Sequence, residues 1–154
     1  MIPLQAQRAF EAMLSLPWKQ GPEWATNGGV FVSVTNFEVN RLRDLPGAYL
    51  AGLRLRRAWP TMTGAVGLRL WARPWQRRSG AISVWRTEED LRRFVSWPVH
   101  AAIMRDYGHR ATVASHSWIA DRFIPPDVQR EARLTVIGEP LERRAGLRLG
   151  CRRR

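Results

Sequence analysis

The stretch from Gly80 to Trp118 constrains the fold of this chain most strongly. Residues 81–85 alternate in polarity and are rich in β-branched and aromatic residues, which predicts a strand. Thr87, followed by three acidic residues, predicts a helix start, because a hydroxyl caps free N–H groups and negative charge stabilises that end. Pro98 then divides the helix into two pieces, since proline lacks the N–H that a helix interior needs. Residues 112–118 predict a returning strand.

The residues before Gly80 predict a second set of elements, which precedes the strand, broken helix and strand described above. They favour a strand over 30–39, a helix that begins near Asp44 and stops before Pro60, and a strand over 65–72. The polar link 74–80 is short, so the strands on either side of it should form an antiparallel hairpin. The order β-α-β-β-α-β predicts an α+β, ferredoxin-like fold: a four-stranded antiparallel sheet with its helices on one face.

Alternation along the predicted strands gives the sheet two distinct faces. The first face is apolar and carries Val30, Val32, Val34, Val66, Leu68, Leu70, Ile82 and Val84. The second face is aromatic and partly polar and carries Phe31, Ser33, Thr35, Arg69, Trp71, Ser83 and Trp85. Neither face suits water, and one pair of helices covers only one of them. We therefore expect a second copy of the chain to cover the other face, in a homodimer.

The length of 154 residues suits a single domain with a real core. We expect an N-terminal arm over 1–29, the ferredoxin-like domain over 30–123, a C-terminal helix over 124–140 and a basic tail over 141–154. No apolar run reaches the roughly 20 residues of a membrane span, and no signal-peptide pattern opens the sequence. The single cysteine, Cys151, forms no internal disulfide. These features predict a cytoplasmic protein.

The charge balance is strongly basic. Lys and Arg number 25 against 13 Asp and Glu, which gives a formal net charge of +12. Such a charge attracts nucleic acid or anionic lipid. The arginines are spread along the chain, however, and no zinc-finger spacing, RNA-binding aromatic signature or helix-turn-helix pattern accompanies them. We therefore expect no nucleic-acid partner.

One histidine stands out as a candidate for chemistry. His100, Ile103, Met104 and Tyr107 have the i, i+3, i+4, i+7 spacing of a buried helix face. An inward histidine could act as a general base near neutral pH or bind haem iron. It could equally be a structural residue that a backbone carbonyl satisfies at the helix break. The sequence shows no metal triad, phosphate-binding loop or nucleophile elbow.

The element order and three short motifs resemble the dimeric α/β-barrel superfamily, which contains the antibiotic-biosynthesis-type monooxygenases. The motifs are the strand and acidic helix start over 82–94, the Trp-Pro-Val-His run over 97–100, and the Ser-His-Ser-Trp run over 115–118. The resemblance covers about residues 30–123, and within the superfamily it is greatest to spheroidene-monooxygenase-like domains. It implies a homodimer.

The resemblance also implies a monooxygenase-like enzyme that acts on a hydrophobic aromatic or polyene molecule. In cofactor-independent members, a base removes a substrate proton and the carbanion reduces oxygen, a role that falls here to His100. The residues expected to contact substrate are Ser33, Thr35, Arg69, Trp71, Trp85, Trp97, Met104, Tyr107, His116 and Trp118.

Three alternatives stay open at this point. A haem version would use His100 or His116 as the axial ligand, but the haem-degrading relatives have their histidine near the position of Met104, where this chain departs from the pattern. The same pocket could serve a non-redox isomerase, cyclase or dehydratase. The domain could also bind a ligand without catalysis, since fold does not decide function.

Overall fold

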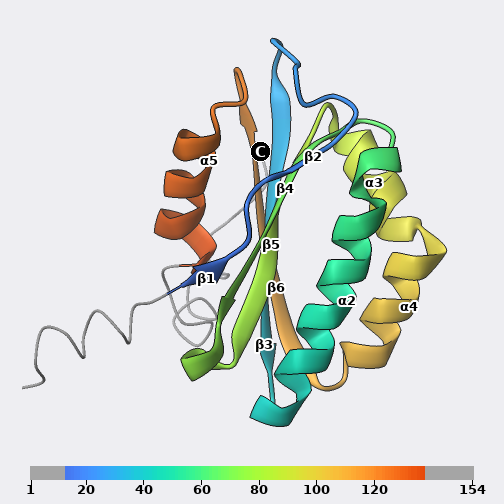
Figure 1. The fold of residues 1–154 in the computed structure, drawn as a ribbon, viewed down its shortest axis with the longest axis vertical. Helices are drawn as coiled ribbons and strands as arrows, with labels where there is room; N and C mark the ends of the chain where they lie inside the picture. Colours follow the sequence, from blue (N-terminus) through green and yellow to red (C-terminus); the bar gives the residue numbers. More distant parts are fainter. Residues whose placement is uncertain (1–12, 138–154) are drawn as a thin grey trace, which may run out of the picture.

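The computed structural model describes residues 13–137 and shows one antiparallel sheet with helices on both faces (Figure 1). Its strands are β1 (Leu14–Ser15), β2 (Lys19–Gln20), β3 (Val30–Val39), β4 (Ala65–Arg73), β5 (Arg78–Trp85) and β6 (Ala111–Ala120). Its α-helices are α2 (Leu45–Ala58), α3 (Glu88–Ser96), α4 (Pro98–Tyr107) and α5 (Pro125–Ala132). Short helical turns are η1 (Leu42–Asp44), η2 (Trp59–Thr61), η3 (Pro74–Gln76) and the π-helical η4 (Arg133–Ile137).

The predicted ferredoxin-like topology is confirmed. The four long strands lie in the order β4-β5-β3-β6, and η3 joins β4 to β5 as a hairpin. The sheet is wider than four strands, because the short β1 and β2 of the arm both pair with β4. Among the described residues, no helix is long and apolar enough to cross a membrane.

The broken helix forms for the reasons that its sequence gives. The Thr87 hydroxyl accepts from the backbone N–H of Asp90, and the Asp90 carboxylate accepts from the backbone N–H of Thr87, which makes a reciprocal capping box. At the other end of α3, Trp97 is extended with ψ 130°, as expected for a residue that precedes proline. Pro98 then begins α4. The two helices therefore meet at a fixed angle around Trp97.

A β-bulge in β4 overturns part of the predicted division into faces. Val66 and Gly67 together oppose Val84, so one extra residue is inserted and the alternation of β4 reverses. Beyond the bulge, Leu68 pairs with Ser83, and the strand therefore turns its leucines towards α2 and α3. Arg69 pairs with Ile82 and lies on the opposite, valine-bearing face.

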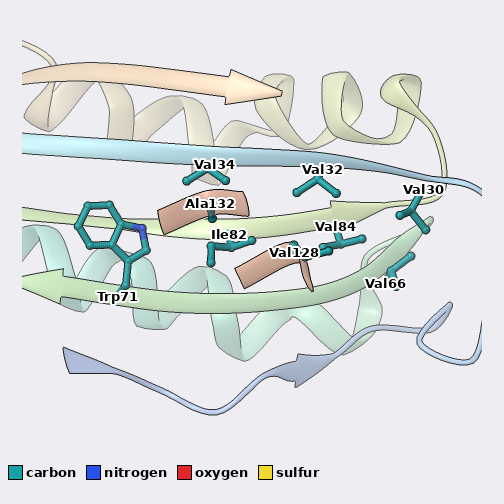
Figure 2. Close-up of a cluster of buried hydrophobic side chains, with 9 residues drawn as sticks. All are labelled: Val30, Val32, Val34, Val66, Trp71, Ile82, Val84, Val128 and Ala132. Atoms are coloured by element: carbon teal, nitrogen blue, oxygen red, sulfur yellow. The ribbon is translucent and has the colours of Figure 1, made fainter. Parts of the chain in front are cut away.

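That opposite face is covered by the chain's own C-terminal helix. Figure 1 shows α5 on one side of the sheet and α2, α3 and α4 on the other. Val128 and Ala132 of α5 point into a buried cluster with Val30, Val32, Val34, Val66, Trp71, Ile82 and Val84 (Figure 2). The arm adds Trp18, and Phe123 follows β6. An uncovered apolar face was the physical argument for a homodimer, and that argument no longer holds for this face.

The predicted segments outside the core lie partly beyond the described residues. The short strands of the arm lie within the predicted 1–29, and α5 with η4 lies within the helix predicted over 124–140. Residues 1–12, residues 138–140 and the predicted basic tail over 141–154 lie outside the described part of the chain.

Candidate functional site

A cavity of about 320 Å³ lies between the sheet and the helices α2, α3 and α4. The sheet wall is rich in hydroxyls, from Ser33, Thr35, Ser79, Ser83, Ser115 and Ser117. The helix wall is apolar and aromatic, with Leu55, Leu91, Phe94, Val95, Ile103 and Met104. No Asp, Glu, Lys or Arg of the described residues lines this cavity. A ligand here would be mainly apolar, with a few hydrogen-bonding groups turned towards the sheet.

Strand pairing places three of the serines side by side. Ser83 of β5 pairs with Ser33 of β3, which pairs with Ser117 of β6. Neighbouring strands lie about 4.8 Å apart, so the three side chains form a row across the floor of the cavity. The Ser83 hydroxyl donates to the carbonyl oxygen of Ser33 at 3.2 Å. All three serines belong to the lining of the cavity.

His100 reaches the cavity from the first turn of α4. Its Nδ1 lies 3.1 Å from the carbonyl oxygen of Val95, in the last turn of α3, where carbonyls have no partner within the helix. A carbonyl only accepts, so Nδ1 carries the proton in this contact. In the neutral ring Nε2 is then unprotonated and free to take a proton.

Partial burial favours the neutral form of this imidazole. The pKa of His100 is lowered from 6.5 mainly by desolvation, and the hydrogen bond to Val95 opposes that effect only in part. The ring also lies 4.7 Å from the ring of Phe94, centroid to centroid, on the apolar wall. A neutral histidine with a fixed tautomer and a free Nε2 has the properties of a general base near pH 7.

The cavity brings together some of the predicted site residues and excludes others. Of the predicted site residues, it is lined by Ser33, Thr35, His100, Met104 and Tyr107. It is not lined by Arg69, Trp71, Trp85, Trp97, His116 or Trp118.

Four of the excluded residues lie on the opposite face of the sheet. The bulge in β4 turns Arg69 and Trp71 away from the cavity, where the Arg69 guanidinium donates to the Ser15 hydroxyl at 3.0 Å. His116 pairs with Val34 and Trp118 with Val32, so both follow the valine-bearing face. The sheet therefore separates His116 from His100.

The two remaining tryptophans, Trp85 and Trp97, lie outside the cavity lining and near Phe94, which is part of it. Trp85 is buried against Trp59 and Phe94, with ring centroids 4.7 and 5.1 Å away. Trp97 lies at the helix break, 6.3 Å from Phe94. Phe94, whose ring lies near both tryptophans, lines the cavity itself and was not among the predicted site residues.

Several other lining residues were also missed by the sequence analysis. Tyr49 contributes from α2, and Ser79, Ser83, Ser115 and Ser117 contribute from β5 and β6. A signal for two of the serines was present, because Ser115 and Ser117 alternate along β6 and pair with Thr35 and Ser33 of β3. Such residues leave space above a sheet where large ones would fill it.

The cavity does not fit a haem. An engineered cavity of about 150 Å³ holds one benzene, so the volume here suits two or three fused rings and not a tetrapyrrole. Its lining also lacks cationic side chains that would pair with the propionates. Within the described part of the chain, no group of three His, Cys, Asp or Glu side chains could hold a metal ion.

Solved structures of several candidate monooxygenases have a fold similar to this one. A candidate antibiotic biosynthesis monooxygenase from Nitrosomonas europaea matches at a TM-score of 0.54 and 10% identity, over 65% of this chain and 96% of its own. A second candidate antibiotic biosynthesis monooxygenase, from Caulobacter crescentus, matches at a TM-score of 0.51 and 12% identity, over 66% of this chain and 97% of its own. A candidate monooxygenase from Lactobacillus acidophilus matches at 0.52 and 10%, over 68% of this chain but only half of its own.

These likenesses establish the fold that the resemblance implied, the antibiotic-biosynthesis-monooxygenase-like arrangement of sheet and helices. The finer resemblance to spheroidene-monooxygenase-like domains stays a prediction. No family model matches the sequence, and no curated protein matches it.

Proposed function

We propose that this protein is a cofactor-independent, monooxygenase-like enzyme that oxidises a compact, electron-rich aromatic molecule in the cavity between the sheet and the helices. The observation that carries the proposal is the geometry of His100. Its proton is held on Nδ1 by the Val95 carbonyl, and its ring lines an apolar cavity whose sheet wall carries hydroxyls. The likeness of fold to monooxygenase-like proteins supports the same reaction class.

The chemistry follows from these groups. Nε2 of His100 removes a proton from a hydroxyl group on the substrate ring, which leaves carbanion character on a ring carbon that bears hydrogen. The serine row binds the substrate's oxygens. The resulting carbanion reduces oxygen, and recombination gives a hydroperoxide. Loss of water from the hydroperoxide leaves a carbonyl on that carbon. One oxygen atom of O₂ ends in the product and the other in water, so no external reductant is needed.

The volume of the cavity selects among the substrates that the resemblance implied. About 320 Å³ is roughly twice the volume that holds benzene. This favours two or three fused rings over a long polyene. The helix wall, with Phe94 and Met104, contacts the faces of such a ligand, and the hydroxyls of the sheet contact its edge.

Oxygen uptake with a panel of hydroxylated naphthalenes tests the proposal. Wild-type protein should consume one O₂ for each substrate molecule oxidised, and His100→Ala should consume none above the buffer rate. The His100→Ala variant should still bind the hydroxylated naphthalenes, as measured by quenching of tryptophan fluorescence. Product formed without oxygen uptake would instead indicate the non-redox isomerase, cyclase or dehydratase, and binding without any product would indicate a ligand-binding domain.

A further inference from the structure

A second apolar hollow lies directly outside the cavity. It has a volume of about 380 Å³ and opens at the edge of the sheet where β4 meets the arm. Its lining comes from five elements and consists of Leu14, Leu42, Leu45, Pro46, Tyr49, Ala72 and Pro74. Apart from the Tyr49 phenol, every one of these side chains is apolar. We call this hollow the outer groove.

Tyr49 is the one described residue that lines both the cavity and the outer groove. It projects from the second turn of α2, and its ring packs partly buried against the cluster formed by Leu68 and Leu70. The Tyr49 side chain therefore borders both the cavity that His100 lines and the outer groove.

We infer that Tyr49 limits the length of the ligand that the cavity accepts, and that the outer groove is the space an alkyl substituent would enter if the ring were absent. This inference rests on the proposed function, because it concerns ligands bound in that cavity. It assigns a specificity-determining role to a residue that takes no part in proton transfer.

The chemistry of the outer groove restricts what it would accept. Leu14 and Leu42 are each 57% exposed, so the groove presents apolar surface to water that a hydrocarbon chain would remove. Each buried methylene contributes about 0.8 kcal/mol, which is roughly a fourfold gain in affinity. A charged or strongly polar substituent would find no partner there among the described residues.

Direct binding of 2-naphthol and its 6-methyl, 6-butyl and 6-hexyl derivatives tests the inference, with quenching of tryptophan fluorescence as the readout. Wild-type protein should bind 2-naphthol and the methyl derivative and should bind the longer derivatives at least tenfold more weakly. Tyr49→Ala should bind the butyl derivative at least tenfold more tightly than wild type does. Tyr49→Phe keeps the ring and should behave as wild type.

Two further variants make the result specific to the outer groove. Tyr49→Leu removes the ring with less loss of packing, and should show the same gain if Tyr49→Ala fails to fold. Leu42→Asp places a carboxylate on the far side of the groove at an exposed position. Combined with Tyr49→Ala or Tyr49→Leu, it should remove the gain for the butyl and hexyl derivatives, while 2-naphthol binding stays as it is in the single Tyr49 variant.

The outcomes separate this inference from the proposed function. If 2-naphthol binds every variant equally and the alkyl derivatives gain nothing from loss of the Tyr49 ring, the length limit is wrong and the cavity proposal stands. If the gain in affinity for the alkyl derivatives survives Leu42→Asp, the alkyl substituent leaves the cavity by another route. The role inferred for the outer groove would then be wrong. If no derivative binds any protein, both the inference and the ligand cavity are overturned.

Discussion

The Nδ1 atom of His100 lies 3.1 Å from the carbonyl oxygen of Val95, across the break between α3 and α4. This contact joins the two interpretations of His100 that the sequence left open. The ring satisfies a free carbonyl at the helix break, as a structural histidine would, and the same hydrogen bond leaves Nε2 unprotonated on a ring that lines the cavity. The hydrogen bond to Val95 thus fixes the tautomer that His100 needs to act as a base.

Substitution of His100 should remove turnover while the protein stays folded. His100→Ala loses one half-buried hydrogen bond, which should lower the free energy of unfolding by about 1 kcal/mol. His100→Gln can restore a donor to the Val95 carbonyl and recover part of that stability, but its amide is not a base. Oxygen uptake and thermal melting, measured on both variants, check this. A variant that still turns over hydroxylated naphthalenes at the wild-type rate would reject the catalytic role.

Activity should fall as the pH drops below the pKa of His100. Because desolvation lowers this pKa from 6.5, the ring is already neutral at pH 7, and the rate should be independent of pH above that value. Acidification protonates Nε2 and removes the base. The pH–rate profile should therefore show a single acidic limb with a midpoint below 6.5, and a midpoint above 6.5 would contradict the burial argument.

The same shift predicts how stability depends on pH. A histidine with a lowered folded pKa binds fewer protons when folded than when unfolded, so its contribution is complete above 6.5 and is lost as the pH falls through the folded pKa. His100→Gln should flatten the change in unfolding free energy across this window. Urea titrations of both proteins from pH 7.5 to 5 measure the difference, and identical slopes would show that another group is responsible.

Gly67 should not tolerate a side chain. A Cβ there would lie 3.0 Å from Trp24, 3.1 Å from Trp18 and 3.2 Å from Phe123, three rings that pack together over the bulge. Gly67→Ala should therefore destabilise the protein by about 1–3 kcal/mol through overpacking.

Gly52 in α2 provides the matched control for this substitution. A Cβ at Gly52 meets Leu70 at an ordinary 3.6 Å, and alanine favours a helix over glycine by about 1 kcal/mol. Gly52→Ala should raise the urea midpoint, whereas Gly67→Ala should lower it. Equal changes in the urea midpoint for the two substitutions would mean that the rings of Trp18, Trp24 and Phe123 move to accommodate the added methyl group.

The homodimer stays a prediction, and the structure indicates which surface to test. Since α5 covers the valine-bearing face, we expect contact through the edge of β6, a strand of ten residues with no charged side chain and no proline. Ile119 on this strand is 78% exposed. Ile119→Asp should convert a dimer to a monomer in sedimentation without changing the melting temperature. A wild-type monomer at micromolar concentration, or a dimer that resists this substitution, would contradict the expectation.

Local sequence determined the elements of this protein and their order. The alternation of β3 and β5, the Thr87 cap and Pro98 act within a few residues, so their consequences can be read directly from the chain. The inward position of His100 followed from the helical spacing of its neighbours in the same way. These features depend on backbone geometry that each segment has by itself.

Tertiary structure alone decided which residues share the cavity. The extra residue at the bulge in β4 reverses the side-chain alternation beyond it, and this moved Arg69 and Trp71 to the face opposite His100. The cover of that face by Val128 and Ala132 depends on α5 returning across the sheet from far along the chain. A one-residue change in register and a long-range packing contact leave no periodic signal in the sequence, because both arise only when separate segments meet.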